Sequence, residues 1–253
     1  MQEQMAEDLS LEAMAQQAAM SPHHFLRIFR QLTGIPPVRF LNAIRLEEAK
    51  KLLLTTERSV TDICADVGYK SLGTFTTRFT QLVGLSPGQF RTLGRAFTVS
   101  SNELIALAVD HLSAHSKPDG NAIRGRVIGN EDIDGPIFVG LFTHPIPQER
   151  PVACAVLKAP GRFDMNVSER GTFFLFAAGI GQKDRAADSL LCGSSIRGIA
   201  SLGPLKLTED GHFEEPVLVL RPPAVLDPPL LITLPILIDE RLADLGGSDG
   251  KEI

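Results

Sequence analysis

Histidine side chains are the first candidates for chemistry in this chain. His23 and His24 are adjacent, and His111 and His115 are four residues apart, a spacing that zinc ligands use on a helix. Neither pair has a third ligand nearby, and no glutamate lies between His111 and His115 as in zinc proteases. We therefore expect surface side chains at these positions and no metal site.

The three cysteines are too scattered for a disulfide framework or a metal motif. Cys64 lies in an apolar helical pattern that predicts a packing role, Cys154 lies in an apolar run typical of a buried strand, and Cys192 lies in a predicted loop. The chain shows no nucleophile motif, no paired carboxylates and no phosphate-binding loop, since Gly179-Ile180-Gly181 alone is unspecific. The sequence thus predicts no catalytic residue and no cofactor.

Charge is distributed unevenly along the 253 residues. Residues 1–98 carry 11 Lys+Arg and 9 Asp+Glu, a net charge of +2, while residues 99–253 carry 14 Lys+Arg and 21 Asp+Glu, a net charge of −7. Such asymmetry favours a nucleic-acid-binding module joined to a second module. The first residues do not resemble a signal peptide, and no apolar run approaches the roughly 18 residues of a membrane span. We therefore expect a cytoplasmic protein.

A repeat with an offset of 50 residues occupies the first hundred residues. Upstream the offset becomes 49, so the second copy has one extra residue in its turn. The chain therefore contains two copies of one structural unit. The matching pairs are Phe25 and Phe75, Phe29 and Phe79, Gln31 and Gln81, Leu32 and Leu82, Gly34 and Gly84, Pro37 and Pro87, and Phe40 and Phe90.

Each copy predicts two short helices joined by a tight turn, which is a helix-turn-helix unit. Serines precede the four helical patterns and predict their N-caps, while glycines predict the ends of the second helices. These capping residues are Ser10, Ser21, Ser59 and Ser71, then Gly34 and Gly84. The predicted buried stripes of the second helices are Phe25, Ile28, Phe29 and Leu32 in one copy and Phe75, Phe79 and Leu82 in the other.

A longer helix is predicted between the copies, opened by Pro36-Pro37 and closed by Thr55-Thr56. About 18 residues give a rod of roughly 27 Å, close to the ~34 Å between successive major-groove faces of DNA. A rigid helix of this length could hold two DNA-contacting helices about one DNA turn apart. Its polar face is predicted to point to water with Glu47, Glu48, Lys50 and Lys51.

The second part of the chain changes its apolar period. Residues 101–115 predict an amphipathic connector helix, and an all-β sandwich is expected after it. The run Phe173–Ala177 is apolar on both faces, so the tail at Leu230–Leu242, the connector helix or another chain should cover its second face. The predicted strands are 123–128, 136–142, 151–157, 162–167, 172–178, 196–200 and 217–220.

Two segments of the first part carry a family resemblance. MSPHHFLRIFRQLTGIPPVRFLNAIRLEEAKKLL and VTDICADVGYKSLGTFTTRFTQLVGLSPGQFR resemble the DNA-binding domain of AraC/XylS-type bacterial transcription regulators, over about residues 8–95. The resemblance implies binding to double-stranded DNA. It departs from the family where the first helix is usually longer, and where Thr77 replaces the usual arginine, with Arg78 one place later. The family also more often puts this domain last.

The exposed faces of the second helices are the expected sites of base contact. Arg27 is the strongest candidate, because one guanidinium can bond guanine O6 and N7 together. The resemblance implies base contacts from His23, Leu26 and Arg27, and the corresponding face of the second unit is Leu72, Gly73, Thr76 and Thr77. Phosphate contacts are expected from Arg30, Arg39, Lys70, Arg78 and Arg91, and from the helix starts near Ser10 and Ser59.

The sequence therefore predicts a multidomain protein. Residues 1–98 form an all-α double helix-turn-helix domain, residues 99–121 a connector, and residues 122–253 an all-β sandwich. The stretch VLKAPGRFDMNVSERGTFFLFAA makes residues 122–180 resemble a prealbumin-like, carboxypeptidase-regulatory-type sandwich, which implies no catalysis.

The expected function is that of a sequence-specific transcription regulator. Its C-terminal domain would sense a small-molecule effector, bind a protein partner or form a homodimer, and its acidity should keep it off the duplex. Two alternatives stay open: an enzyme that acts on a small molecule and is tethered to DNA, and an architectural DNA-binding protein of low sequence specificity.

Overall fold

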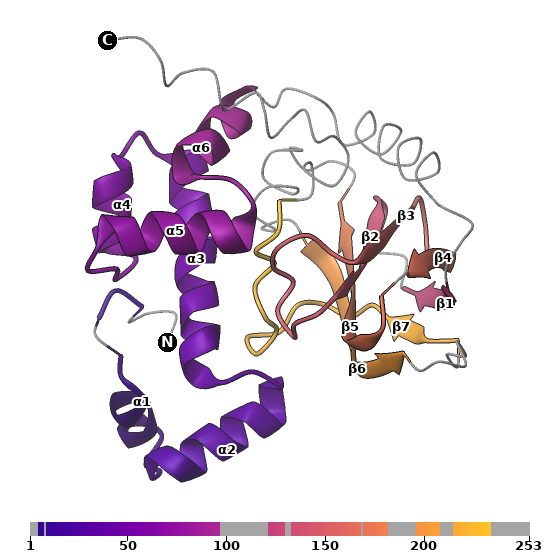
Figure 1. Ribbon diagram of the computed structural model, residues 1–253, viewed down its shortest axis with the longest axis horizontal. Coiled ribbons are helices and arrows are strands. Elements are labelled where there is room, and N and C mark those ends of the chain that lie inside the picture. The colour runs from indigo at the N-terminus through magenta and orange to yellow at the C-terminus, as the bar shows by residue number, and fades with distance from the viewer. Residues whose placement is uncertain are drawn as a thin grey trace.

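The computed structural model describes residues 5–7, 9–96, 121–129, 133–167, 169–181, 196–207 and 215–233. Within this part six helices come first and seven strands follow, and helices and sheets lie side by side (Figure 1). The predicted helical-plus-β layout is confirmed. The connector helix predicted at 101–115, with His111 and His115, lies outside the described residues, as do Cys192 and the tail beyond Thr233, and the predicted domain limits stay predictions.

Serine caps begin four of the helices, as the sequence predicts. Each serine Oγ accepts a hydrogen bond from the backbone N–H three residues later, for example Ser10 from Ala13 at 3.2 Å and Ser59 from Asp62 at 3.1 Å. Gly34 and Gly84 end two helices with φ of 72° and 93°, a conformation that favours glycine. The helices are α1 (Leu11–Gln17), α2 (Pro22–Thr33), α3 (Pro37–Thr55), α4 (Val60–Asp66), α5 (Leu72–Val83) and α6 (Pro87–Ala96).

The two helix pairs, α1–α2 and α4–α5, differ in how deeply they are buried. In α5, Phe75 and Phe79 are fully buried, and the Phe79 ring meets the Phe90 ring edge-on at 5.6 Å between centroids. No residue of α2 is fully buried, and Leu32 is 68% exposed, so its predicted place in a buried stripe is wrong. The physical reason is that α3 packs against α4 and that Ile146 and Leu231 from the β part join the apolar cluster that contains Phe75 and Phe79.

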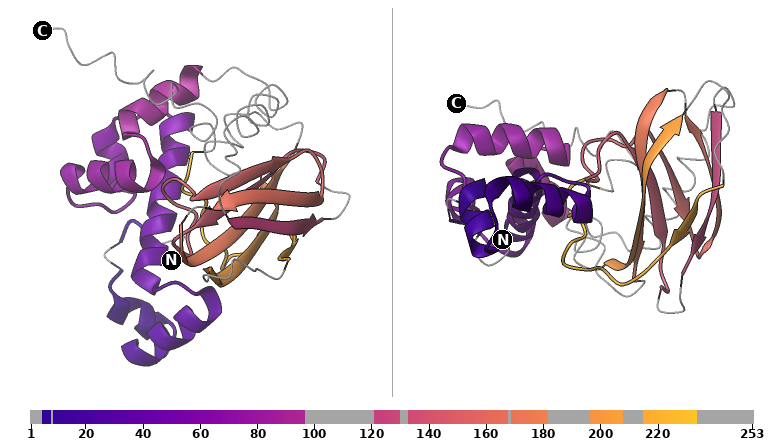
Figure 2. Two further views of the ribbon diagram at one scale, coloured as in Figure 1. Left: turned by 45° about the vertical axis from the view of Figure 1, so that its right-hand side comes forward. Right: turned by 90° about the horizontal axis from the view of Figure 1, so that it is seen from below.

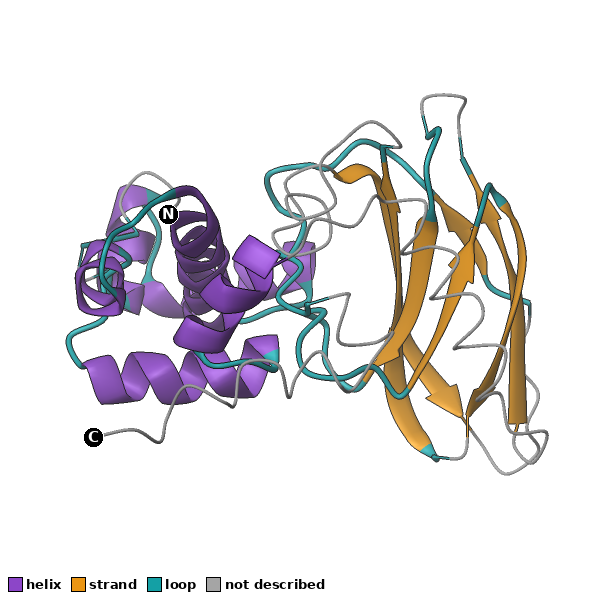
Figure 3. Cartoon of the chain, turned by 90° about the horizontal axis from the view of Figure 1, so that it is seen from above, coloured by secondary structure: helices purple, strands orange, loops and turns teal. Residues whose placement is uncertain are grey.

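Seven strands form two sheets that pack face to face (Figure 3). One sheet has the order β4-β1-β7, with β7 parallel to β1, and the other has the order β3-β2-β5-β6. Their facing side chains, among them Ile123, Val139 and Leu175, form one apolar core. The strands are β1 (Asn121–Ile128), β2 (Ile137–Phe142), β3 (Ala153–Leu157), β4 (Gly161–Val167), β5 (Gly171–Ile180), β6 (Ile196–Leu207) and β7 (Val217–Val219).

Strand β6 is longer than the predicted 196–200. Gly203 and Pro204 interrupt the apolar pattern, which hides the second half of the strand from sequence analysis. In the structure this half pairs with the start of β5, with a register shift between Phe173 and Leu175. A bulge of this kind lets an irregular segment continue a ladder.

The outer face of β5 is covered, as its apolar sequence predicts. Phe176 packs with Phe138 and Phe142 of β2, and Leu230 and Ile232 close over this cluster. The tail, the connector helix or another chain was expected to cover this face. Among the described residues, the beginning of the tail makes the contacts.

Two segments of the sandwich pack onto the helices (Figure 2). They are loop 143–150, between β2 and β3, and residues 230–233. Ile146 and Leu231 are buried in the same apolar cluster as α3, α5 and α6. The backbone N–H of Glu149 donates to the Leu82 carbonyl at 2.9 Å, and Thr233 Oγ1 donates to the Val83 carbonyl at 3.2 Å. The end of α5 is therefore attached to the sandwich.

The burial of Lys50 differs from the prediction made from the helical pattern. It was expected to face water, but its side chain is fully buried, and its Nζ donates to the Leu230 carbonyl at 2.7 Å and to Glu47 Oε2 at 3.1 Å. The reason is that residues 230–233 cross α3 at this point. The buried charge is acceptable because it is both paired and hydrogen-bonded.

Glu47 should make stability depend on pH. Burial raises its pKa from 4.5 to about 6, although Lys50 acts in the opposite direction. The unfolded carboxyl ionises near its ordinary pKa, so between pH 4.5 and 6 folding must also bind a proton. Wild-type protein should therefore lose up to about 2 kcal/mol of stability relative to Glu47→Gln as pH rises through this window.

Chemical denaturation at a series of pH values would measure this difference. Glu48→Gln is the matched control, because Glu48 pairs with the exposed Lys51 at 3.8 Å and makes the smallest of the contributions to the raised pKa of Glu47. It should keep most of the pH dependence of the wild type. Parallel profiles for wild type and Glu47→Gln would mean that the surroundings of Glu47 do not raise the pKa of this carboxyl.

Candidate DNA-binding surface

The outward face of α2 is basic and carries no carboxylate. His23, Arg27 and Arg30 are exposed, and Leu26 is half-buried beside them. The Arg27 guanidinium is held along the helix, with Nη1 donating to Gln31 Oε1 at 3.4 Å and Nη2 lying 3.2 Å from His24 Nδ1. The sequence does not predict that Gln31 and His24 orient Arg27, because a side chain's orienting partners depend on its rotamer.

The outward face of α5 carries hydroxyl and methyl groups in place of charge. Leu72 is 42% exposed, Gly73 and Thr77 are exposed, and Thr76 is half-buried. A Cβ added at Gly73 would meet nothing nearer than Ser71 Oγ at 3.8 Å. Packing within the described residues therefore does not require glycine there, and the open space leaves room for close approach from outside.

The eight arginines of the helical part fall into two groups. Four bond to the protein itself: Arg45 Nε donates to the Met5 carbonyl at 2.8 Å, Arg58 pairs with Asp66, Arg95 pairs with Glu57, and Arg91 donates to the carbonyls of Leu53 and Arg58. The other four are exposed, and three of them, Arg30, Arg39 and Arg78, make no hydrogen bond or ion pair within the described part of the chain. This division follows from tertiary contacts and has no signal in the sequence.

The structure also shows where the remaining residues predicted to contact phosphates lie. Lys70 is exposed beside the start of α5, and Ser10 and Ser59 are exposed caps of α1 and α4. Each of these two helices has a carboxylate in its first turn, Glu12 or Asp62. Hydrogen bonds from its own backbone and from Ser10 lower the pKa of Glu12, so it is ionised and opposes an anion at this helix start.

The described thiols are not suited to nucleophilic chemistry. Cys64 is buried, as predicted, and its Sγ donates to the Tyr69 carbonyl at 3.7 Å. Cys154 lies on β3 and is half-buried, less than its apolar run predicted. Burial raises the pKa of both thiols, that of Cys154 to about 11, which keeps them protonated at neutral pH.

Two further findings limit the chemistry of the described residues. They contain no group of three or more His, Cys, Asp or Glu side chains arranged to hold a metal ion, and His23 and His24 are exposed on α2. None of the described helices is both long and apolar enough to cross a bilayer.

The known proteins that resemble this chain match its helical part. Residues 14–93 match the family model described as a helix-turn-helix domain. An uncharacterized HTH-type transcriptional regulator of Haemophilus influenzae is 40% identical over 89 residues, covering 35% of this chain and 30% of that protein. The bifunctional transcriptional activator/DNA repair enzyme AdaA of Bacillus subtilis is 34% identical over 89 residues, covering 35% of this chain and 42% of that protein. A solved structure, the DNA-binding domain of AdpA in complex with a target DNA, is 34% identical, with 38% of this chain and 86% of that chain covered and a TM-score of 0.37.

Residues 14–93 are therefore a helix-turn-helix domain of the AraC type, related to bacterial transcription regulators. The chain spans only about a third of the length of the curated relatives it matches, between 30% and 42% for the two described here. With AdaA only this domain is shared, so the repair activity in that protein's name is not carried over.

Proposed function

We propose that this protein is a sequence-specific transcription regulator that binds double-stranded DNA in the cytoplasm through α1–α6. The observation that carries the proposal is the division of the arginines. Arg45, Arg58, Arg91 and Arg95 are bonded within the protein, while Arg27, Arg30, Arg39 and Arg78 are exposed on α2, α3 and α5. The family match over residues 14–93 supports the same conclusion.

Two helix-turn-helix units would contact successive major grooves. The units are α1–α2 and α4–α5, and α3 joins them with 19 residues, about 29 Å at 1.5 Å per residue. That length is close to one turn of DNA. The proposed base contacts are His23, Leu26 and Arg27 on α2, and Leu72, Gly73, Thr76 and Thr77 on α5.

Phosphate contacts would come from Arg30, Arg39, Lys70 and Arg78, with a weaker contribution at the start of α1 near Ser10. Ser59 is a poorer candidate, because its hydroxyl donates to Asp62 Oδ2 at 2.7 Å. Arg91 is bonded to the carbonyls of Leu53 and Arg58, so we propose that it holds α6 to the end of α3 in place of contacting DNA.

The salt dependence of binding would test these phosphate contacts. Arg30→Ala should lower the slope of log K against log salt by about 1, because one fewer counterion is released. Arg95→Ala removes the same charge from α6, but its guanidinium is paired with Glu57, so the slope should not change. Fluorescence anisotropy at several salt concentrations would measure both slopes. Equal slopes for Arg30→Ala and wild type would exclude Arg30 from the interface.

The β-sandwich would respond to an effector, a protein partner or a second copy of the chain. Its attachment to the end of α5 supports a regulatory role, because a change in the sandwich would reach a DNA-contacting helix. The net charge of −7 over residues 99–253 would keep it off the phosphates. Its resemblance to prealbumin-like regulatory sandwiches is part of this proposal and adds no catalytic role.

A genome-wide binding map would test the proposed function most directly. We expect discrete sites that contain two conserved half-sites about one DNA turn apart. Anisotropy with a recovered site should then give an affinity at least about 1,000-fold above that for random DNA of equal length. Uniform binding without discrete sites would instead support an architectural DNA-binding protein.

A further inference from the structure

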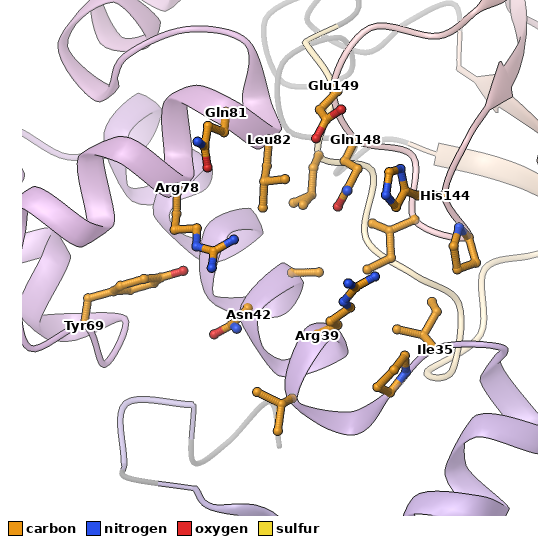
Figure 4. A pocket seen from close by; sticks show the side chains of 16 residues that line it. Ile35, Arg39, Asn42, Tyr69, Arg78, Gln81, Leu82, His144, Gln148 and Glu149 are labelled. Atoms are coloured by element: carbon orange, nitrogen blue, oxygen red, sulfur yellow. The ribbon is translucent and has the colours of Figure 1, made fainter.

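A cleft of about 440 Å³ lies between the helices and the sandwich. Arg39 and Asn42 of α3, Tyr69 and Arg78 of the second helix pair, and Gln148 and Glu149 of loop 143–150 line it (Figure 4). Its volume is within the range of small-molecule sites. Ile146, buried in the helical core, and the Glu149–Leu82 backbone bond hold the loop in place, so both walls are formed without a ligand.

Positive charge dominates the polar wall of the cleft. The guanidinium groups of Arg39 and Arg78 both point into it, and neither has a hydrogen bond or ion pair among the described residues (Figure 4). Glu149 is the one carboxylate among the lining residues. Two guanidinium groups present several N–H donors to a carboxylate or phosphate, which is the geometry that binds such anions best.

The phenol of Tyr69 adds a neutral donor. Burial raises its pKa, with Arg45 and Arg78 acting in the opposite direction, so the hydroxyl stays protonated at neutral pH. Apolar side chains also line the cleft, Ile35, Leu82 and Leu231 among them. A ligand that fits both the arginines and these apolar side chains has one anionic group and a short apolar body.

We propose that this cleft binds a small organic anion, a carboxylate or phosphate ester with an apolar body, and that the anion and the DNA backbone compete for Arg39 and Arg78. The competition rests on the proposed function, in which these arginines contact phosphates. The anion site itself rests only on the geometry of the cleft. An occupied cleft would therefore weaken DNA binding, and the effector site would lie between the two domains.

Tyr69 makes the site directly observable. It is the single tyrosine of a chain that has no tryptophan, so tyrosine emission from the full-length protein reports on the cleft. We expect octanoate to change this emission saturably, while octanamide, of the same shape but neutral, binds about 10- to 100-fold more weakly. Inorganic phosphate tests the anionic group without the apolar body and should bind more weakly than octanoate. Lack of a saturable change with octanoate, or equal affinities for octanoate and octanamide, would overturn the proposal.

Substitutions of the two cleft arginines test whether octanoate binds in the cleft. Arg39→Gln and Arg78→Gln should each weaken octanoate binding by about 10-fold or more. Both side chains are exposed, so neither change should unfold the protein, which circular dichroism would verify. Arg95→Ala, which removes one positive charge outside the cleft, should leave the octanoate affinity unchanged. An equal loss in Arg95→Ala would mean a general charge effect and would overturn the site.

Measurements of DNA affinity distinguish a failure of this inference from a failure of the proposed function. With a recovered binding site, saturating octanoate should lower the affinity for DNA by about 10-fold or more, as expected when charged contacts are lost. Octanamide at the same concentration should have no effect. Octanoate binding together with undiminished DNA affinity would overturn the competition. Failure of the protein to bind specific DNA would overturn the proposed function, while the Tyr69 titration would still decide the anion site.

Discussion

Phe79→Ala is expected to lower the free energy of unfolding of the helical part by about 3–5 kcal/mol. Phe79 is fully buried on α5, and its ring lies 5.6 Å from the rings of both Phe75 and Phe90. Removing it would leave a cavity between α5 and α6, at the end of α5 where the sandwich is attached. The loss combines the transfer free energy of the ring with the cost of a cavity that rigid neighbours cannot fill.

Urea denaturation followed by helical circular dichroism would measure the effect. Leu32→Ala is the control, because this side chain is 68% exposed and the change should cost only about 0.5 kcal/mol or less. Phe29→Ala tests the same repeat position in the first pair, where the ring is half-buried, and should fall between the two. Equal losses for Phe29→Ala and Phe79→Ala would contradict the unequal burial of the two helix pairs.

Arg27→Ala is expected to weaken binding to the specific DNA site by about 1–3 kcal/mol and to relax the preference at one base pair. The side chain is exposed on α2, and Gln31 and His24 hold its guanidinium along the helix. A group held in one orientation loses less entropy when it forms a bidentate contact with guanine. Binding to random DNA should change much less, because it depends on phosphate contacts.

Thr77→Ala is the matched comparison on α5. A threonine offers one hydroxyl and one methyl group, so its loss should cost less than that of Arg27. Anisotropy with the recovered site and with single-base variants of it would measure both. Equal losses for the two variants, or no loss for Arg27→Ala, would show that the two helices do not divide base contacts in this way.

The attachment of the sandwich to the helices gives a physical route for the proposed regulation. Loop 143–150 and residues 230–233 bond to Leu82, Val83 and Lys50, which lie at the end of α5 and on α3. A ligand or partner that shifted either segment would change the packing of α5, which we propose to contact DNA. This coupling uses direct contacts and needs no longer pathway.

Much of the helical part could be predicted from the sequence by itself. Serine before an apolar 3.6-residue pattern and glycine after it are local signals, so the caps at Ser10 and Ser59 and the ends at Gly34 and Gly84 agree with the structure. Apart from the second half of β6, the strands were also predicted, because apolar runs separated by turn residues are a local signal. The outward positions of Arg27 and Thr77 follow from the same helical period.

Only the tertiary structure decided which polar residues are outward and which are held inside. The sequence placed Lys50 in water, but residues from the distant tail bury it. Two backbone carbonyls accept hydrogen bonds from Arg91, whose predicted phosphate contact stays a prediction. A charge pattern on one helix does not show which segment, 180 residues away, will cross it. The cleft between Arg39, Arg78 and Glu149 likewise exists only because a β-sandwich loop packs against α5, and a local pattern cannot specify a contact between separate domains.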